Sequence, residues 1–507
     1  MKKVLTVGIW IMLLSVPLAC AVPFDGKSDV NIINYTGQSS FGYALATSGD
    51  LNGDGYSDLV VSAGDRAMVF YGGPGFDGNS DVNITSADGY YSLATAGDLN
   101  NDGYADLVVG APSISGKAFV YYGGPSFDNN PDWNITDHPE DYFGSSVATS
   151  GDLNGDGYAD LVVGAVNAGK AFVYYGGSSF DNNSDINITN YIGETGFGRS
   201  VATSGDLNGD GYADLVVGAY SAANKAFVFY GGPSFDNNSD WNITNYTSES
   251  GFGSSLATSG DLDGDGYADL VIGAYDSDSR KAFVFYGGPS FDNNSDVNIT
   301  DHTAEENFGI SVATSGDLNN DGYADLIVGA SGAKKAFVYY GGPGFNNISD
   351  VNITDHRGVS TFGWSLATSG DLNNDGYADL VIGSNTGTKV FVYYGVDYPL
   401  KSMSQPTIVT LQGKLTNSTT GIAISTGSMR VTVRDNKANQ VWQSTFNNVL
   451  NNGVFNIPLG AAQELRLIPG IMYRMVVELD ADAASFSSAD VTFGDNLPAG
   501  DLIKFTA

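Results

Sequence analysis

Short apolar and alternating segments recur along most of the chain. In one stretch, residues 146–151 lead into an Asp-rich turn, and the apolar run 161–165 follows it. Residues 170–177 and 185–189 then complete a unit of about 54 residues. Segments of this length, rich in Val, Phe and Tyr and bounded by Gly, Asn and Asp, are typical of β-strands. Each unit is therefore predicted to hold four strands, A to D, with the Asp-rich turn between A and B.

The unit occurs seven times. Its most regular part is a nine-residue segment that starts, at intervals of 48 to 56 residues, at Asp50, Asp98, Asp152, Asp206, Asp261, Asp317 and Asp371. A four-stranded unit of this length suits a propeller blade better than a helical solenoid. The seventh unit ends after strand C, whereas residues 24–32 read as a strand D without a blade. We therefore predict an all-β fold with a seven-bladed β-propeller, in which this N-terminal strand closes the last blade.

The nine-residue segment reads D-x-[ND]-x-D-G-x-x-D, with oxygen-bearing side chains at positions one, three, five and nine. Ca²⁺ takes about six to eight oxygen ligands, and Gly at position six allows the sharp turn that such a loop needs. A plain turn without metal is the alternative, but it would not require carboxylates at three fixed positions, where they repel one another. We therefore predict about seven calcium ions per chain.

The predicted ligands are one set of five per loop, with each Tyr acting through its backbone carbonyl. They are Asp50, Asn52, Asp54, Tyr56, Asp58; Asp98, Asn100, Asp102, Tyr104, Asp106; Asp152, Asn154, Asp156, Tyr158, Asp160; Asp206, Asn208, Asp210, Tyr212, Asp214; Asp261, Asp263, Asp265, Tyr267, Asp269; Asp317, Asn319, Asp321, Tyr323, Asp325; and Asp371, Asn373, Asp375, Tyr377, Asp379.

Two short motifs flank the strands of each unit. Gly-Ala follows strand B in most units, and the second unit keeps the full Gly110-Ala111-Pro112 but has Tyr90-Tyr91 before strand A. In the other units Phe-Gly stands before strand A, at residues 41, 143, 197, 252, 308 and 362. Over residues 24–395 the chain resembles the FG-GAP repeats of integrin α-subunit heads. The resemblance implies a seven-bladed propeller, calcium in the Asp-rich loops, and a role in binding or adhesion.

The N-terminus has the pattern of an export signal. Positive residues precede a short apolar run, and small residues precede a cleavage site after Ala21. A lipid anchor at Cys20 is the alternative, because Leu18-Ala19-Cys20 is close to a lipobox. No later apolar run is long enough for a transmembrane helix, so we expect a secreted or cell-surface protein. The predicted parts are a signal peptide at 1–21, the propeller at 22–398, a linker at 399–406 and a C-terminal β-sandwich accessory domain at 407–507.

Composition narrows the partners. The formal net charge is −35, with 57 Asp and Glu against 22 Lys and Arg. Nucleic acid is therefore not an expected partner, because phosphate binding depends on cationic side chains.

The loops that join strand B to strand C, and strand D to the next strand A, vary between units. Residues 275–280 and 305–307 are examples. Variable loops on a rigid scaffold often bind ligands, so we expect an extracellular protein or glycan to meet the face opposite the calcium loops.

Three functions remain open. The first is a non-enzymatic binding or adhesion protein, and the second is an extracellular polysaccharide-active enzyme on the same propeller. The third is a structural spacer of a surface layer or appendage. The chain has no G-x-S-x-G, no H-E-x-x-H and no Cys nucleophile, so we predict no enzyme.

Two other recurring features were considered as sites. His138, His302 and His356 alternate with Tyr at one repeat position, which favours a packing role over metal binding. Asn-Ile-Thr, which fits the N-glycosylation sequon, recurs at Asn83, Asn134, Asn187, Asn242, Asn298 and Asn352.

Overall fold

The computed structural model divides into two compact units, Pro23–Asp397 and a unit formed by Met1–Val22 with Tyr398–Ala507. It describes residues 6–11, 28–33, 40–85, 89, 91–95, 97–112, 116–136, 142–178, 180–189, 191, 193–203, 205–220, 223–300, 302–314, 316–354, 359–368, 370–386, 389–395, 409–416, 428–434, 440–446, 454–459, 473–480 and 492–497.

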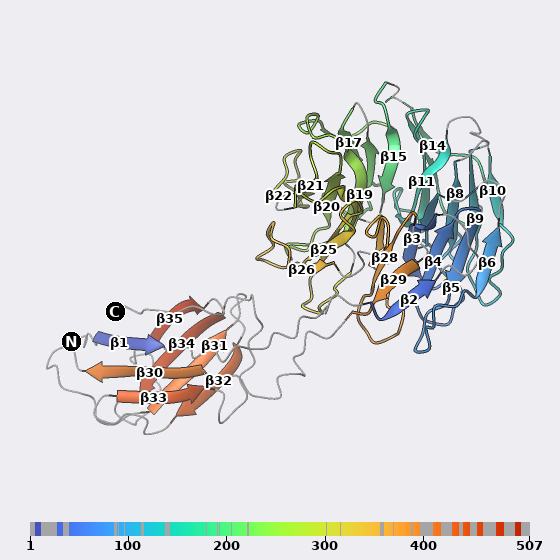
Figure 1. The fold of residues 1–507 in the computed structure, drawn as a ribbon. Coiled ribbons are helices and arrows are strands. Elements are labelled where there is room, and N and C mark those ends of the chain that lie inside the picture. The colour runs from blue at the N-terminus through green and yellow to red at the C-terminus, as the bar shows by residue number, and fades with distance from the viewer. Residues whose placement is uncertain are drawn as a thin grey trace. The chain divides into compact units, whose positions relative to one another are not determined.

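The first unit is a propeller of seven four-stranded antiparallel sheets, as predicted (Figure 1). Strand A is β3 (Phe41–Gly49), β7 (Ser92–Ala94), β11 (Phe143–Gly151), β15 (Phe197–Ala202), β19 (Phe252–Gly260), β23 (Phe308–Ala313) and β27 (Ser365–Ala367). Strand B is β4 (Asp58–Ala63), β8 (Leu107–Ala111), β12 (Asp160–Ala165), β16 (Leu215–Ala219), β20 (Asp269–Ala274), β24 (Leu326–Ala330) and β28 (Leu380–Gly383).

The two outer strands follow in the same order. Strand C is β5 (Arg66–Phe70), β9 (Lys117–Tyr121), β13 (Lys170–Tyr174), β17 (Lys225–Phe229), β21 (Lys281–Phe285), β25 (Lys335–Tyr339) and β29 (Lys389–Tyr393). Strand D is β6 (Val82–Thr85), β10 (Trp133–Ile135), β14 (Ile186–Ile188), β18 (Trp241–Ile243), β22 (Val297–Ile299), β26 (Val351–Ile353) and, for the seventh blade, β2 (Val30–Ile33).

The closing strand lies where the sequence predicts it. β2 pairs antiparallel with β29, with Val30 opposite Val392 and Ile32 opposite Val390. The Asp29 carboxylate also accepts the N–H of Tyr394 at 2.9 Å. In the first blade, Asp81 accepts the Tyr71 N–H in the same way, so β2 takes the place of a regular strand D.

The hydrophobic core lies between the blades. Each buried cluster combines residues of two neighbouring blades: one joins Val60 and Val69 of the first blade to Leu107 and Val109 of the second. The cluster at the seam joins Ile32 and the first blade to the seventh. Strand B is buried on both faces in every blade, which explains why its sequence is a continuous apolar run rather than an alternating one.

The second unit contains two sheets, in agreement with a small β-sandwich. One sheet has the order β1 (Thr6–Ile11), β30 (Val409–Thr416), β33 (Val454–Leu459). The other has the order β32 (Gln440–Phe446), β31 (Ser428–Arg434), β34 (Tyr473–Asp480), β35 (Thr492–Leu497). Strand β1 lies inside the predicted export signal and pairs with β30, while cleavage of that signal and the lipid anchor at Cys20 stay predictions. None of the residues that the structure describes forms a helix able to cross a membrane.

Candidate functional site

The Asp-rich loops connect strand A to strand B, and the first loop shows their common geometry. The Asp50 carboxylate accepts the N–H groups of Gly53 and Asp54 at 2.7 and 3.1 Å on Oδ1, and that of position six at 2.8 Å on Oδ2. Asn52 Oδ1 accepts the Asp54 N–H at 2.8 Å, and Asp54 Oδ1 accepts the N–H of Tyr56 at 3.0 Å. The curl of the loop thus gathers the side chains of positions one, three and five.

The Asp at position nine has different hydrogen-bond partners from positions one, three and five. Asp58 is fully buried, and its two carboxylate oxygens accept the N–H groups of Leu51 at 2.8 Å and Gly72 at 2.9 Å. Burial raises the pKa of Asp58 to about 7, although these two hydrogen bonds act in the opposite direction. The equivalent residues Asp106, Asp160, Asp214, Asp269, Asp325 and Asp379 have the same pair of contacts and raised pKa values. Position nine therefore anchors each loop to strand C of its own blade.

The fifth loop differs from the others at position three. In the other six loops an Asn amide at this position donates to the carboxylate of position five, as Asn208 does to Asp210 at 2.9 Å. Asp263 cannot make this bond. Carboxylate oxygens of Asp261, Asp263 and Asp265 all lie within 4.8 Å of one another. Burial, followed by the charge of Asp265, raises the pKa of Asp263. Three adjacent carboxylates are the donor set that a hard cation needs.

The loops of neighbouring blades are joined by backbone hydrogen bonds. The carbonyl of Leu207, at position two, accepts the N–H of Gly288 in the next blade at 2.7 Å. The carbonyl of Asp206 accepts the N–H of Ala268 at 3.4 Å. The Leu contact is found at six of the seven junctions, and the remaining one falls at residue 396, outside the described residues. Each loop is thereby fixed to the next one around the ring.

A cavity of about 1170 Å³ lies on the opposite face, at the propeller axis. Its walls include residues 166–169 of a B–C loop and residues 193–196 of a D–A loop. One repeat position reaches it from every blade, namely the residue that follows Phe-Gly or, in the second blade, the residue that follows Gly89-Tyr90. These seven residues are Tyr43, Tyr91, Ser145, Arg199, Ser254, Ile310 and Trp364.

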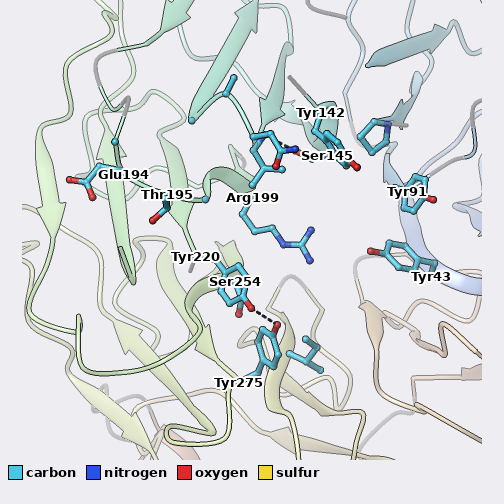
Figure 2. A pocket seen from close by; sticks show the side chains of 18 of the residues that line it. Tyr43, Tyr91, Tyr142, Ser145, Glu194, Thr195, Arg199, Tyr220, Ser254 and Tyr275 are labelled. Atoms are coloured by element: carbon cyan, nitrogen blue, oxygen red, sulfur yellow. Dashed lines mark hydrogen bonds between the residues drawn. The ribbon is translucent and has the colours of Figure 1, made fainter. Parts of the chain in front are cut away.

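Aromatic side chains form two groups in this axial cavity. The ring of Tyr43 lies 5.4 Å from that of Tyr91 and 5.6 Å from that of Trp364, measured between ring centroids. Tyr220 and Tyr275 stack at 5.7 Å, and their hydroxyl oxygens are 3.0 Å apart. Figure 2 shows the Arg199 side chain extending into the open space between Tyr43 and the Tyr220–Tyr275 pair.

The loops predicted to bind ligand have mixed roles. Tyr275 lines the axial cavity, but Asp276 accepts a hydrogen bond from Ser250. Glu305 forms an ion pair with Lys335 at 2.6 Å, so this part of a variable loop has a structural partner. The sequence-based interpretation missed the residue after Phe-Gly. Its signal was available: this position varies between Tyr, Ser, Arg, Ile and Trp, beside a Phe-Gly pair that barely changes.

The His/Tyr position is a packing position in the described repeats. His302 stacks on Phe337 at 3.7 Å, as Tyr246 packs on Phe283 at 4.7 Å. Each of these side chains also forms a hydrogen bond with a Ser hydroxyl in the turn that precedes strand D of the next blade. His138 and His356 lie outside the described residues. The Asn of all six sequons is exposed on strand D, and glycosylation there stays a prediction.

Comparison with known proteins gives two kinds of relative. A family model described as an FG-GAP-like repeat matches residues 50–109, 152–217, 206–272, 261–328 and 317–382, together more than half of the chain. Integrin alpha-5 of Xenopus laevis is 31% identical over 240 residues, which are 43% of this chain and 22% of that protein. Integrin alpha-PS2 of Drosophila melanogaster is 30% identical over 231 residues, 40% of this chain and 16% of that protein. The matches thus span about a fifth of the integrin chains.

Solved structures share the fold. BBS1N, in a crystal complex with ARL6DN, superposes with a TM-score of 0.52 at 12% identity, covering 73% of this chain and 98% of that chain. A chain of the mitotic checkpoint complex superposes with a TM-score of 0.50, also at 12% identity, covering 74% and 97%. At this identity the likeness concerns the propeller architecture alone.

Proposed function

The chain belongs to the family of FG-GAP-like repeat proteins, and on this premise we propose that it is an exported, calcium-binding adhesion or binding protein. Calcium in the seven A–B loops stiffens one face of the propeller. The opposite face, with its variable loops and axial cavity, meets an extracellular protein or glycan.

The calcium proposal is carried by the fifth loop. Asp261, Asp263 and Asp265 hold three carboxylates close together without the Asn amide that relieves the other loops. A divalent cation would offset this repulsion and would also compensate the buried Asp269 beneath the loop. In each loop the side chains of positions one, three, five and nine, with the carbonyl of position seven, are the groups that would hold it. Bound calcium supplies charge and rigidity.

The binding proposal rests on the axial cavity. Among the described residues that line it, Glu194 alone carries a carboxylate, and both of its oxygens accept hydrogen bonds from Lys225, at 2.7 and 2.9 Å. Glycoside hydrolysis generally uses two carboxylates on either side of the scissile bond. The cavity is therefore better suited to holding a ligand than to cleaving a polysaccharide. The integrin alpha relatives support the same choice.

Calcium dependence is tested by melting the full chain in millimolar CaCl₂ and in EGTA, together with a count of bound metal. A ligand that binds the folded state raises Tm by mass action. We expect a clear rise in Tm and about seven ions per chain. An unchanged Tm with no bound metal would show that the loops are turns only.

The binding role is tested by attaching fluorescent beads coated with the protein to a panel of cells and extracellular matrices. We expect saturable attachment that EGTA abolishes. Turnover of a glycan or ester panel would instead favour the enzyme, and the absence of both attachment and turnover would favour the spacer.

A further inference from the structure

The part of the axial cavity that the structure describes has two charged lining residues, Glu194 and Arg199. Glu194 already pairs with Lys225. Lys281 and Lys335, at the same repeat position as Lys225, pair with Glu249 and Glu305 in the same way. Among the residues that the structure describes, the Arg199 side chain has no ion pair or side-chain hydrogen bond. Arg199 is thus a cationic side chain without a described charged partner, in a chain whose net charge is −35.

The surroundings of Arg199 make this charge a recognition group. Its side chain is partly buried, so its guanidinium is less hydrated than on an open surface. Tyr43 lies on one side of it and Tyr275 lies on the other (Figure 2), and Trp364 packs against Tyr43. A guanidinium presents a planar fork of N–H donors that matches a carboxylate, and the pair is strongest where water is partly excluded.

We propose that the axial cavity receives a single carboxylate of a protein partner, either an Asp or Glu side chain or a chain terminus, which pairs with Arg199. The aromatic walls cover the apolar part of the inserted segment. This inference rests on the proposed binding role and specifies what the variable face recognises.

A protein segment is favoured over an acidic sugar by the composition of the cavity wall. Tyr, Trp and Arg dominate the energy of protein interfaces, and Tyr, Ser, Gly and Asn are the residues that antibody loops use to contact proteins. The cavity brings together Tyr43, Trp364 and Arg199 with Ser145 and Asn167.

The test selects a displayed library of random hexapeptides, flanked by neutral linkers, on the full chain in calcium. The same protein is applied to an array of acidic and neutral oligosaccharides. The key variant is R199S, because Ser occupies this repeat position in the third and fifth blades and is compatible with the fold. The matched control is I310S, which makes the same side chain in the sixth blade and removes no charge.

We expect selected peptides to be enriched in Asp, Glu or a free C-terminus, and R199S to bind the leading peptide roughly ten- to a hundredfold more weakly. I310S removes a wall contact but no charge, so it should weaken binding by less than R199S and keep the preference for a peptide carboxylate over its amide. R199K should fall between R199S and the wild type. Replacing the peptide carboxylate by an amide should reproduce the R199S loss.

Three results would overturn the inference: enrichment of peptides without a carboxylate, equal binding by R199S, or binding of acidic sugars without peptides. Cell attachment without acidic peptides would leave the proposed function standing and this inference false. Acidic peptides that bind without any cell attachment would show the reverse.

Discussion

The two faces of the propeller use the same seven repeats in opposite ways. On the face of the Asp-rich loops, every copy of position nine is buried and accepts two backbone N–H groups. On the other face, the residue after Phe-Gly reaches the same cavity from every blade, yet it is Arg199 in one blade, Ile310 in another and Trp364 in a third. Repetition is kept where a side chain holds the ring together. It is lost at the repeat position that lines the cavity.

This difference predicts that stability and recognition can be separated by position. Changes on the loop face should alter Tm and leave the axial cavity intact. Changes at the residue after Phe-Gly, which lines the axial cavity, should alter binding and leave Tm nearly unchanged.

The largest effect is expected at a buried Asp of the loop face. D214A removes the acceptor of the Leu207 and Gly231 N–H groups, which are 2.8 Å from its oxygens. Leaving one buried and one partly buried donor unpaired should lower the free energy of unfolding by about 2–5 kcal/mol. D214N keeps one acceptor and should fall between D214A and the wild type. Urea denaturation in calcium measures this, with R199S as the control from the opposite face. Equal midpoints for D214A and R199S would contradict the separation.

An intermediate effect on stability is expected at the residue that directly follows the cavity-lining position. Ser92, Ser146, Ser200, Ser255, Ser311 and Ser365 each donate to a Gly carbonyl of the next blade.

The first blade departs from that pattern, with Ala44 in place of the Ser. In this blade Ser62 stands where the other blades have Gly. Its hydroxyl oxygen accepts the N–H of Ala44 at 2.8 Å. A Cβ at the equivalent Gly110 would lie 2.1 Å from the Ser92 hydroxyl. A44S alone should therefore overpack the strand pair and cost about 1–3 kcal/mol. The double variant A44S/S62G recreates the other blades and should recover most of the loss. A double-mutant cycle measured by thermal melting tests this, and additive effects would refute the exchange.

The smallest effect is expected from D263N in the fifth loop, and it should change sign with calcium. The new amide can donate to Asp265, as Asn208 does to Asp210, and one repelling charge disappears. In EGTA the variant should gain a few tenths of a kcal/mol, whereas in calcium it should lose affinity at this loop. Melting of the variant and the wild type at several calcium concentrations tests the crossing. A variant more stable at every concentration would show that no cation binds there.

The repeated features of the propeller could be predicted from the sequence, whereas the cavity formed by residues of different blades could not. The Asp-rich loops, the four strands and β2 could be predicted because each one is a pattern within a short segment. The axial cavity could not, because Arg199 and Trp364 are 165 residues apart and meet only once the ring places them at one axis. Glu305 shows another limit: its variable loop predicts binding, which stays a prediction, and the ion pair of its side chain with Lys335 could not be seen in the sequence. The burial of position nine was also hidden, since an Asp in a turn is normally exposed.

The pairing of β2 with β29 determines when the ring can close. Asp29 and Tyr394 are 365 residues apart, so β2 precedes every other propeller strand in the sequence but cannot pair until β29 has been made. The first six blades draw their four strands from consecutive segments and can form as the chain emerges, because their contacts are local. Until β2 of the same chain pairs with it, β29 has an open edge that can pair with a strand of another copy. Because this pairing spans a long sequence separation, we expect closure of the seventh blade to be the last step in folding of the propeller, with β2 of a neighbouring chain as the competing partner of β29.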